Sequence, residues 1–160
     1  MNIVKEKIII FITFFILSFI LGYDSLYRYD HEKLLSKNGN LSDVNTYQSV
    51  IIKGFEGFYE EKRLAPRIIT PLVAHYVYKL FNGKTGSWNP VFFSILLINS
   101  FFVSITCVLM LNYLKFLKYT KNYLPQFFFI TSFGVSSMFL IGLIDAALCF
   151  FIFFYIYSFL

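Results

Sequence analysis

The chain has 160 residues, of which 58% are hydrophobic and 22% aromatic, while only 14% carry a charge. Soluble domains are about half apolar and about a quarter charged, so the composition excludes an ordinary soluble globular domain and favours an integral membrane protein. The net charge of +5 comes with no dense basic patch or nucleic-acid motif, which excludes nucleic acid as a partner. The two cysteines, Cys107 and Cys149, lie apart within apolar runs, which argues against a disulfide framework or a zinc site.

The first apolar run, residues 8–23, contains no charged side chain. As a helix its roughly 16 residues would extend about 24 Å, slightly less than the hydrocarbon core of a bilayer. Lys7 can snorkel and Tyr23 can lie at the interface, which completes the span. A cleaved signal peptide is the alternative, but no small-x-small cleavage motif follows the run. We therefore interpret it as an uncleaved first transmembrane helix.

Residues 24–90 form the only long polar segment and are expected to be a large loop outside the membrane. Within it, Ser42 is a suitable cap for a helix over residues 43–53. Thr70 and Pro71 predict the start of a second helix, because threonine is a common N-cap and proline suits the first helical position.

The second loop helix has an amphipathic pattern. Its aliphatic and aromatic side chains recur at helical spacing, while His75 and Lys79 lie on the other face. Gly83 can end it. Such a helix either lies flat in the membrane interface or covers a small soluble cap, and the sequence alone does not separate the two.

The rest of the chain is mostly apolar. Residues 91–114 predict a second span, preceded by Trp88 as an interfacial anchor. The short basic loop that follows contains Lys115, Lys118 and Lys121 and no acid. Basic loops of this kind stay in the cytoplasm, which also places the N-terminus in the cytoplasm and the large loop outside.

Residues 127–160 are apolar except at Asp145. A single helix of that length would extend about 51 Å, much longer than a bilayer requires. We therefore expect a hairpin of two spans, 127–144 and 146–160, with Asp145 at the outer turn. The last span ends without a polar flank, so we interpret the chain as the N-terminal part of a longer protein.

These features predict an all-α integral membrane protein, a single domain over residues 1–160 with about four transmembrane helices. Its location is expected to be the inner (plasma) membrane, with the large extracytoplasmic loop carrying the amphipathic helices. Membrane lipid is the expected environment.

Two carboxylates are candidate catalytic groups. Asp24 directly follows the first span and can act as a general base on a membrane-bound acceptor; the alternative is that it only marks the end of the helix. Asp145 is expected at the same outer face, and carboxylates at a membrane rim are costly without a role. Together they can bind a substrate hydroxyl, a divalent metal or a basic residue of the loop. The alternative for Asp145 is a solvated turn.

Arg63 and Arg67 are candidate phosphate ligands. Arg67 lies just before the helix that begins near Pro71, so a guanidinium group and free backbone N–H groups would lie together, as phosphate binding requires. The alternatives are salt bridges to Glu60 or Glu61, or contact with anionic lipid headgroups.

The arrangement resembles the GT-C class of polytopic membrane glycosyltransferases. The likeness rests on the acid after a short first span, the long outer loop, the Arg-x-x-x-Pro stretch from Arg67 to Pro71, and the carboxylate of Ile144-Asp145-Ala146. It implies transfer of a sugar from a polyprenyl-phosphate donor outside the cell membrane. It further implies Asp24 as the base with Asp30 as the substitute, Asp145 as a second acidic contributor, and Arg67 on the lipid phosphate.

Two other functions fit the same sequence. One is a non-catalytic membrane subunit or accessory protein that packs against a partner through Asn99, Ser132 and Ser136. The other is a fragment of a transporter that uses Asp145 as an ion site. The sequence identifies no cofactor, sugar or acceptor.

Overall fold

The computed structural model describes residues 3–28, 42–60, 69–86, 88–118, 123–135 and 145–158. These ranges form helices and short turns, with no strand among them; one isolated antiparallel bridge joins Thr85 and Trp88. The helices are α1 (Ile3–Arg28), α3 (Ser42–Lys53), α4 (Phe55–Glu60), α5 (Ile69–Leu80), α6 (Pro90–Phe116), α7 (Leu124–Val135) and α8 (Asp145–Ser158). The all-helical class expected from the sequence is confirmed for the described ranges.

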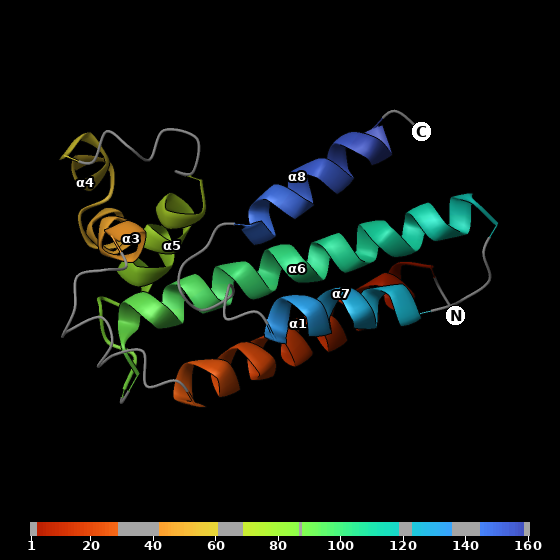
Figure 1. Ribbon diagram of the computed structural model, residues 1–160, viewed down its shortest axis with the longest axis horizontal. Helices are drawn as coiled ribbons and strands as arrows, with labels where there is room; N and C mark the ends of the chain where they lie inside the picture. The colour runs from red at the N-terminus through yellow and green to blue at the C-terminus, as the bar shows by residue number, and fades with distance from the viewer. Residues whose placement is uncertain are drawn as a thin grey trace.

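The central element is α6, against which α1, α5 and α8 pack (Figure 1). Its 27 residues extend about 40 Å at 1.5 Å per residue. Asn89 caps the helix, because its side-chain oxygen accepts hydrogen bonds from the backbone N–H of Val91 at 3.0 Å and of Phe92 at 3.3 Å. Pro90 takes the first position, where no intrahelical donor is needed. Among the described helices, α6 is the one identified as long and apolar enough to cross a membrane.

Helix α1 runs antiparallel to α6. At one end Lys115 Nζ lies 3.1 Å from Glu6 Oε1, and at the other the rings of Tyr23 and Trp88 stack with centroids 4.6 Å apart. The residues of α1 that face inward recur every four positions and are all buried: Ile10, Phe14, Ser18 and Gly22. A Cβ added at Gly22 would overlap the Leu96 side chain, so glycine allows the two helices to approach closely.

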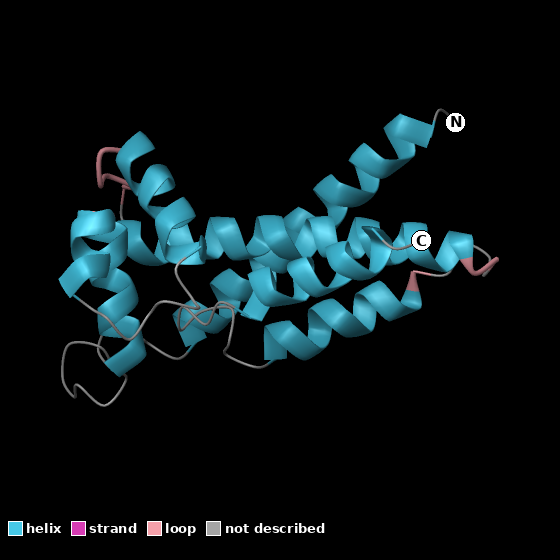
Figure 2. Cartoon of the chain, turned by 90° about the horizontal axis from the view of Figure 1, so that it is seen from above, coloured by secondary structure: helices cyan, strands magenta, loops and turns pink. Residues whose placement is uncertain are grey.

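Three helices, α3, α4 and α5, form a compact group at the N-terminal end of α6, which we call the cap. Figures 1 and 2 show α5 lying across this end of α6 rather than alongside it. Ala74 of α5 joins the main core with Val91 and Ile95 of α6. Tyr47 and Val50 of α3 form a second, smaller core with Phe58 and Leu72 packed on it.

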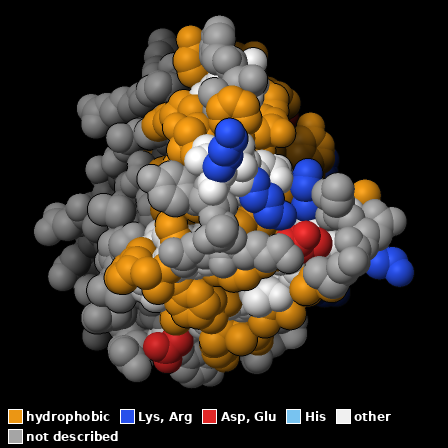
Figure 3. Space-filling model, turned by 90° about the vertical axis from the view of Figure 1, so that its right-hand side faces the viewer, with side chains coloured by type: hydrophobic (Ala, Val, Ile, Leu, Met, Phe, Trp, Pro, Cys, Tyr) orange, Lys and Arg blue, Asp and Glu red, His pale blue; other side chains and the backbone are white. Residues whose placement is uncertain are grey.

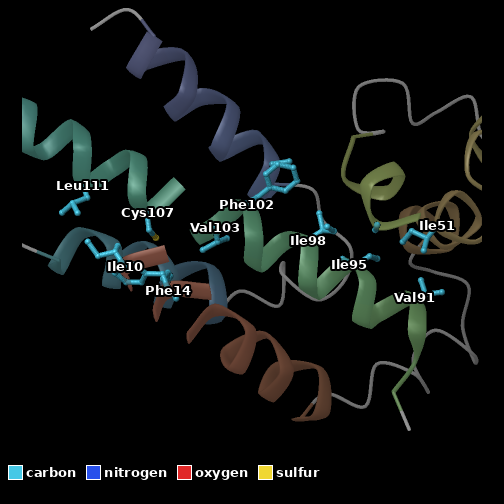
Figure 4. Close-up of a cluster of buried hydrophobic side chains, with 13 residues drawn as sticks. Ile10, Phe14, Ile51, Val91, Ile95, Ile98, Phe102, Val103, Cys107 and Leu111 are labelled. Atoms are coloured by element: carbon cyan, nitrogen blue, oxygen red, sulfur yellow. The ribbon is translucent and has the colours of Figure 1, made fainter. Parts of the chain in front are cut away.

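Helices α7 and α8 complete the bundle. Pro125 lies in the first turn of α7, and Ile130 is its fully buried contact with the core. In α8, Ala147 is buried in the same core, and the ring of Phe150 lies 5.5 Å from that of Phe102 in α6. Figure 4 shows the main core running along α6 from Val91 to Leu111. Figure 1 shows α8 and α1 on opposite sides of α6.

The helix boundaries correct parts of the sequence interpretation. Helix α1 continues to Arg28, so Asp24 lies inside the helix instead of following its end, because no residue there breaks the helical pattern. Helix α5 begins at Ile69, which makes Thr70 a buried helical residue rather than the N-cap. Asp145 is the first residue of α8. Residues 136–144, where the third span was expected to continue, lie outside the described residues.

Other boundaries are confirmed. The helix expected after Ser42 is α3, and residues 91–114 are helical as expected and lie within α6. That this helix crosses a membrane stays a prediction. Helix α5 ends at Leu80, and Gly83 in the following turn has a φ of +65° and donates its backbone N–H to the carbonyl of Tyr78 at 3.0 Å. This is the bond pattern of a glycine-terminated helix.

Candidate functional site

The candidate site lies where the C-terminal part of α1 meets the N-terminal end of α6 and the cap. Asp24 is exposed on α1 at this end. The preceding residue, Tyr23, stacks on Trp88, whose ring also lies 5.9 Å from that of Phe19. The carboxylate is therefore carried by a helix whose end is held by aromatic contacts, an arrangement that suits a positioned base.

The aromatic contacts extend from α1 to the cap. Phe93 of α6 meets the rings of Phe19, Trp88 and Phe81 with centroids 6.2, 5.4 and 5.4 Å apart. Phe81 follows the last residue of α5. These five side chains, Phe19, Tyr23, Phe81, Trp88 and Phe93, are called the aromatic girdle below. The aromatic girdle therefore connects α1, α6 and the residue after α5 at the N-terminal end of α6.

The opposite end of the α1–α6 pair carries basic side chains. Lys5, Lys115 and Lys118 are exposed there, and Lys7 is half-buried. Figure 3 looks onto this end and shows Lys side chains lying beside hydrophobic ones. One end of the pair is therefore basic and the other is aromatic, with an exposed carboxylate.

Asp145 is placed by its backbone at the start of α8. Ala147, two residues further on, is buried against α6. Because α1 and α8 pack on opposite sides of α6 (Figure 1), the two helices that carry Asp24 and Asp145 reach α6 from different directions.

The remaining candidate residues lie outside the described ranges. Asp30, Arg63 and Arg67 all fall there, so their predicted roles stay predictions. Within the described ranges, no group of three or more His, Cys, Asp or Glu side chains is arranged to hold a metal ion.

His75 has a different position from the one expected. It was assigned to the polar face of an amphipathic helix, yet its Nδ1 lies 2.7 Å from the backbone carbonyl oxygen of Ile51 in α3. The ring also packs over Gly54, where a Cβ would lie 2.9 Å from Nε2. Gly54 has a φ of +68° and ends α3. His75 therefore joins α5 to the C-terminal end of α3.

Helix α6 buries several small polar side chains along its length. Three of them return a hydrogen bond to a carbonyl four residues earlier, with lengths of 2.7 Å for Ser94, 2.6 Å for Ser104 and 2.8 Å for Thr106. Asn99 is also fully buried, as expected for a polar residue that faces other helices. Ser132 lies in α7, and Ser136 lies outside the described residues.

The close approach of α1 to α6 at Gly22 was not predicted from the sequence. Ser18 and Gly22 form a small-xxx-small pair on the buried face of α1, the spacing at which helix backbones approach one another. The four-residue spacing of Ile10, Phe14, Ser18 and Gly22 was the available signal.

Comparison of the chain with protein-family models, with curated proteins and with solved structures found no match. The resemblance to GT-C glycosyltransferases therefore stays a prediction from the residues quoted for it.

Proposed function

We propose that this protein is a multi-pass membrane protein of the inner (plasma) membrane, with α1, α6, α7 and α8 in the bilayer and the cap on the outer side. The observation that carries this proposal is the outward face of α1. Its side chains at Val4, Ile8, Ile12, Ile16 and Ile20 recur every four residues and are 49% to 61% exposed. A purely aliphatic stripe of this length, about 24 Å, is unusual on a soluble protein and suits lipid acyl chains.

The dimensions of the α1–α6 pair support the same conclusion. Glu6, which pairs with Lys115, and Tyr23, which stacks on Trp88, mark the two ends of the pair. They are separated by 17 residues of α1, or about 26 Å, close to the hydrocarbon thickness of a bilayer. Charged and aromatic side chains belong at the two edges of that layer.

Helices α7 and α8 have matching outward faces. Among the side chains described in these two helices, the large exposed ones are apolar or aromatic: Leu124, Phe127, Phe128, Phe151, Ile152, Phe154, Tyr155, Ile156 and Tyr157. Lys115 and Lys118 at the far end of α6, with Lys5 near the N-terminus, favour a cytoplasmic location for that end. The cap and Asp24 then face outward.

For the activity, we propose sugar transfer from a polyprenyl-phosphate donor at the outer face. The exposed carboxylate of Asp24, at the level of the aromatic girdle, supports this role because a base at the membrane rim can reach a donor held in the membrane. Asp24 takes the proton of an acceptor hydroxyl while that oxygen bonds to the anomeric carbon. The bond from that carbon to the phosphate oxygen breaks, and polyprenyl phosphate leaves. Arg63 and Arg67 are proposed to bind the phosphate, and Asp145 to contribute a second carboxylate.

The topology is tested by cysteine labelling in intact cells. The background is a variant in which Cys107 and Cys149 are replaced by serine, with single cysteines added at Lys5→Cys or Lys84→Cys, both exposed positions. A membrane-impermeant maleimide should label the Lys84→Cys variant and should label the Lys5→Cys variant only after the cells are opened. Labelling of both variants in intact cells, or release of the protein by alkaline carbonate, would contradict the proposal.

The activity is tested by an Asp24→Asn variant, which keeps the size of the side chain and removes the base. Loss of a general base lowers the rate by about 10²- to 10⁴-fold, so sugar transfer from polyprenyl-phosphate donors to the cell-surface glycan should fall accordingly. Glu56→Gln is the matched control, because Glu56 is an exposed carboxylate of the cap outside the aromatic girdle. Asp30→Asn and Asp145→Asn complete the set. If all three aspartate variants keep the wild-type level of glycan, the proposed sugar-transfer activity is wrong.

A non-catalytic membrane subunit is the second candidate, and the aromatic outward face of α8 favours it. Phe151, Phe154, Tyr155 and Tyr157 are exposed there, and aromatic side chains are common anchors in protein interfaces. A stable complex with one membrane partner that is lost in a Phe154→Ala/Tyr155→Ala variant, together with unchanged glycan in the aspartate variants, would support this role over catalysis.

A further inference from the structure

Helix α5 presents apolar side chains on two faces. One face is buried against α3 and α6 through Thr70, Pro71 and Ala74. The other carries Ile69, Val73, Tyr76 and Leu80, which are 46%, 37%, 64% and 78% exposed. The spacing of three or four residues puts these four side chains on one side of the helix. We call this surface the outer face of α5.

The outer face of α5 is the apolar side of the amphipathic sequence pattern, which fits either the membrane interface or a covered cap. Val73, Tyr76 and Leu80 belong to the apolar side of the amphipathic pattern, yet they point away from the protein core, whereas His75 of the expected polar side contacts α3. The apolar pattern of α5 is therefore explained only in part by contacts within the cap.

Helix α5 lies near the end of α6 that would be at the membrane surface. It lies across the N-terminal end of α6 (Figures 1 and 2). Ala74 packs with Val91 and Ile95 in the first two turns of α6, and Phe81, just past the end of α5, belongs to the aromatic girdle. If α6 crosses the bilayer, α5 is at the depth of the lipid headgroups and lies roughly parallel to the membrane.

We infer that the outer face of α5 inserts into the boundary between headgroups and acyl chains of the outer leaflet, with Lys79 and Lys84 against anionic phospholipid headgroups. This inference rests on the proposed membrane location. Both lysines are exposed, and Lys79 lies on the helix beside the apolar face. A helix with an apolar face and flanking lysines is suited to the interfacial plane of an anionic membrane.

Lipid fits this face better than a soluble protein partner for two reasons. The outer face of α5 lies next to the aromatic girdle, in which Phe81 is also exposed, and extends the exposed apolar surface there. Basic side chains next to it complement the negative charge of a phospholipid surface. An α5 anchored in this way would hold the cap close to lipid-borne substrates.

The experiment uses tryptophan fluorescence in the full chain, because Trp88 is the only tryptophan. A Trp88→Phe background receives either Tyr76→Trp, on the outer face, or Tyr78→Trp, a half-buried position packed on the main core. Each variant is reconstituted into vesicles of phosphatidylcholine and phosphatidylglycerol, with and without lipids brominated on the acyl chains. Quenching by bromolipid reports contact with acyl chains, and quenching by acrylamide reports contact with water.

The Tyr76→Trp variant should lose about half of its emission or more in brominated vesicles and be poorly quenched by acrylamide, as expected for a ring buried at the acyl boundary. The Tyr78→Trp variant should respond weakly to both quenchers. Strong acrylamide quenching at position 76 would overturn the inference, and so would the absence of quenching by either agent, which would indicate coverage by protein.

Two further measurements separate the causes of failure. Flotation of the vesicles tests the membrane location: protein that does not float contradicts the proposed function itself, whereas protein that floats with a water-exposed probe contradicts only the inference about α5. Bromolipid quenching should fall in pure phosphatidylcholine and in a Lys79→Gln/Lys84→Gln variant. Equal quenching in both lipids would overturn the role of the anionic headgroups.

Discussion

The α1–α6 pair and the cap are held together by different kinds of contact. In the pair, a regular four-residue row of α1 packs along α6, with a glycine at the closest approach and an ion pair and stacked rings at the two ends. In the cap, short helices meet around a small core of Tyr47 and Val50 and through one specific polar contact, between His75 and Ile51. A row of repeated contacts tolerates the loss of one member, whereas a glycine at a close approach or a single part-buried polar contact does not. The predictions below test this difference, beginning with the largest expected effect.

Gly22→Leu should be the most damaging substitution in the α1–α6 pair. The added side chain would overlap Leu96, which is almost completely buried, and overpacking of this kind costs about 1–3 kcal/mol. We expect a loss near the upper end, about 3 kcal/mol, in the free energy of unfolding measured by denaturant titration in detergent micelles. Ile20→Ala is the control, because Ile20 faces outward.

The double variant Gly22→Leu/Leu96→Ala makes that test specific. Removal of the Leu96 side chain should recover part of the lost stability, so the two substitutions should be non-additive. Additive losses would show that Gly22 does not act through its contact with Leu96.

His75→Phe should weaken the cap and leave the pair unchanged. The ring stays but its hydrogen bond to the carbonyl oxygen of Ile51 is lost, and a polar group left without its partner costs about 1–3 kcal/mol. We expect a loss of about 1–2 kcal/mol, seen as faster amide hydrogen exchange at the end of α3 and unchanged exchange in α6. His75→Asn retains a donor near the position of Nδ1 and should restore much of the protection. Faster exchange in α6 would contradict the separation of the two regions.

Glu6→Gln should have the smallest effect. The carboxylate pairs with Lys115 at 3.1 Å, but the lysine side chain is 36% exposed, and ion pairs with solvent access contribute about 0–1 kcal/mol. A double-mutant cycle with Lys115→Gln should give a coupling within that range that decreases as salt is added. A coupling of several kcal/mol would mean that the ion pair, rather than the row of apolar contacts, holds this end of the pair.

Residue patterns anticipated much of the fold. Ser42 and Gly83 mark helix ends because they act through local backbone chemistry. Helix α3 begins at Ser42, and Gly83 lies in the turn that follows the end of α5 at Leu80. The predicted start of α5 and the predicted end of α1 were wrong. Thr70 and Asp24 lie inside these helices, because both residues are tolerated there when neighbouring contacts favour the longer helix.

The candidate site was anticipated less well. Asp24 was expected to follow the first helix but lies inside α1. The structural role of His75 was missed, because its partner is a backbone carbonyl 24 residues away and no sequence pattern records such a contact. The close approach at Gly22 depends in the same way on a residue of another helix, Leu96.

Sequence alone determined the helical class, the long apolar α6 and the lysines that lie at its C-terminal end, because these follow from composition and local spacing. Only the tertiary structure decided which apolar side chains pack against other helices and which point away from the protein. Lipid chains are as apolar as a protein core, so the hydrophobic period of a helix is the same whether its apolar face packs inward or points to the bilayer. The exposed rows of α1 and α5 therefore became visible only when the neighbouring helices were in place.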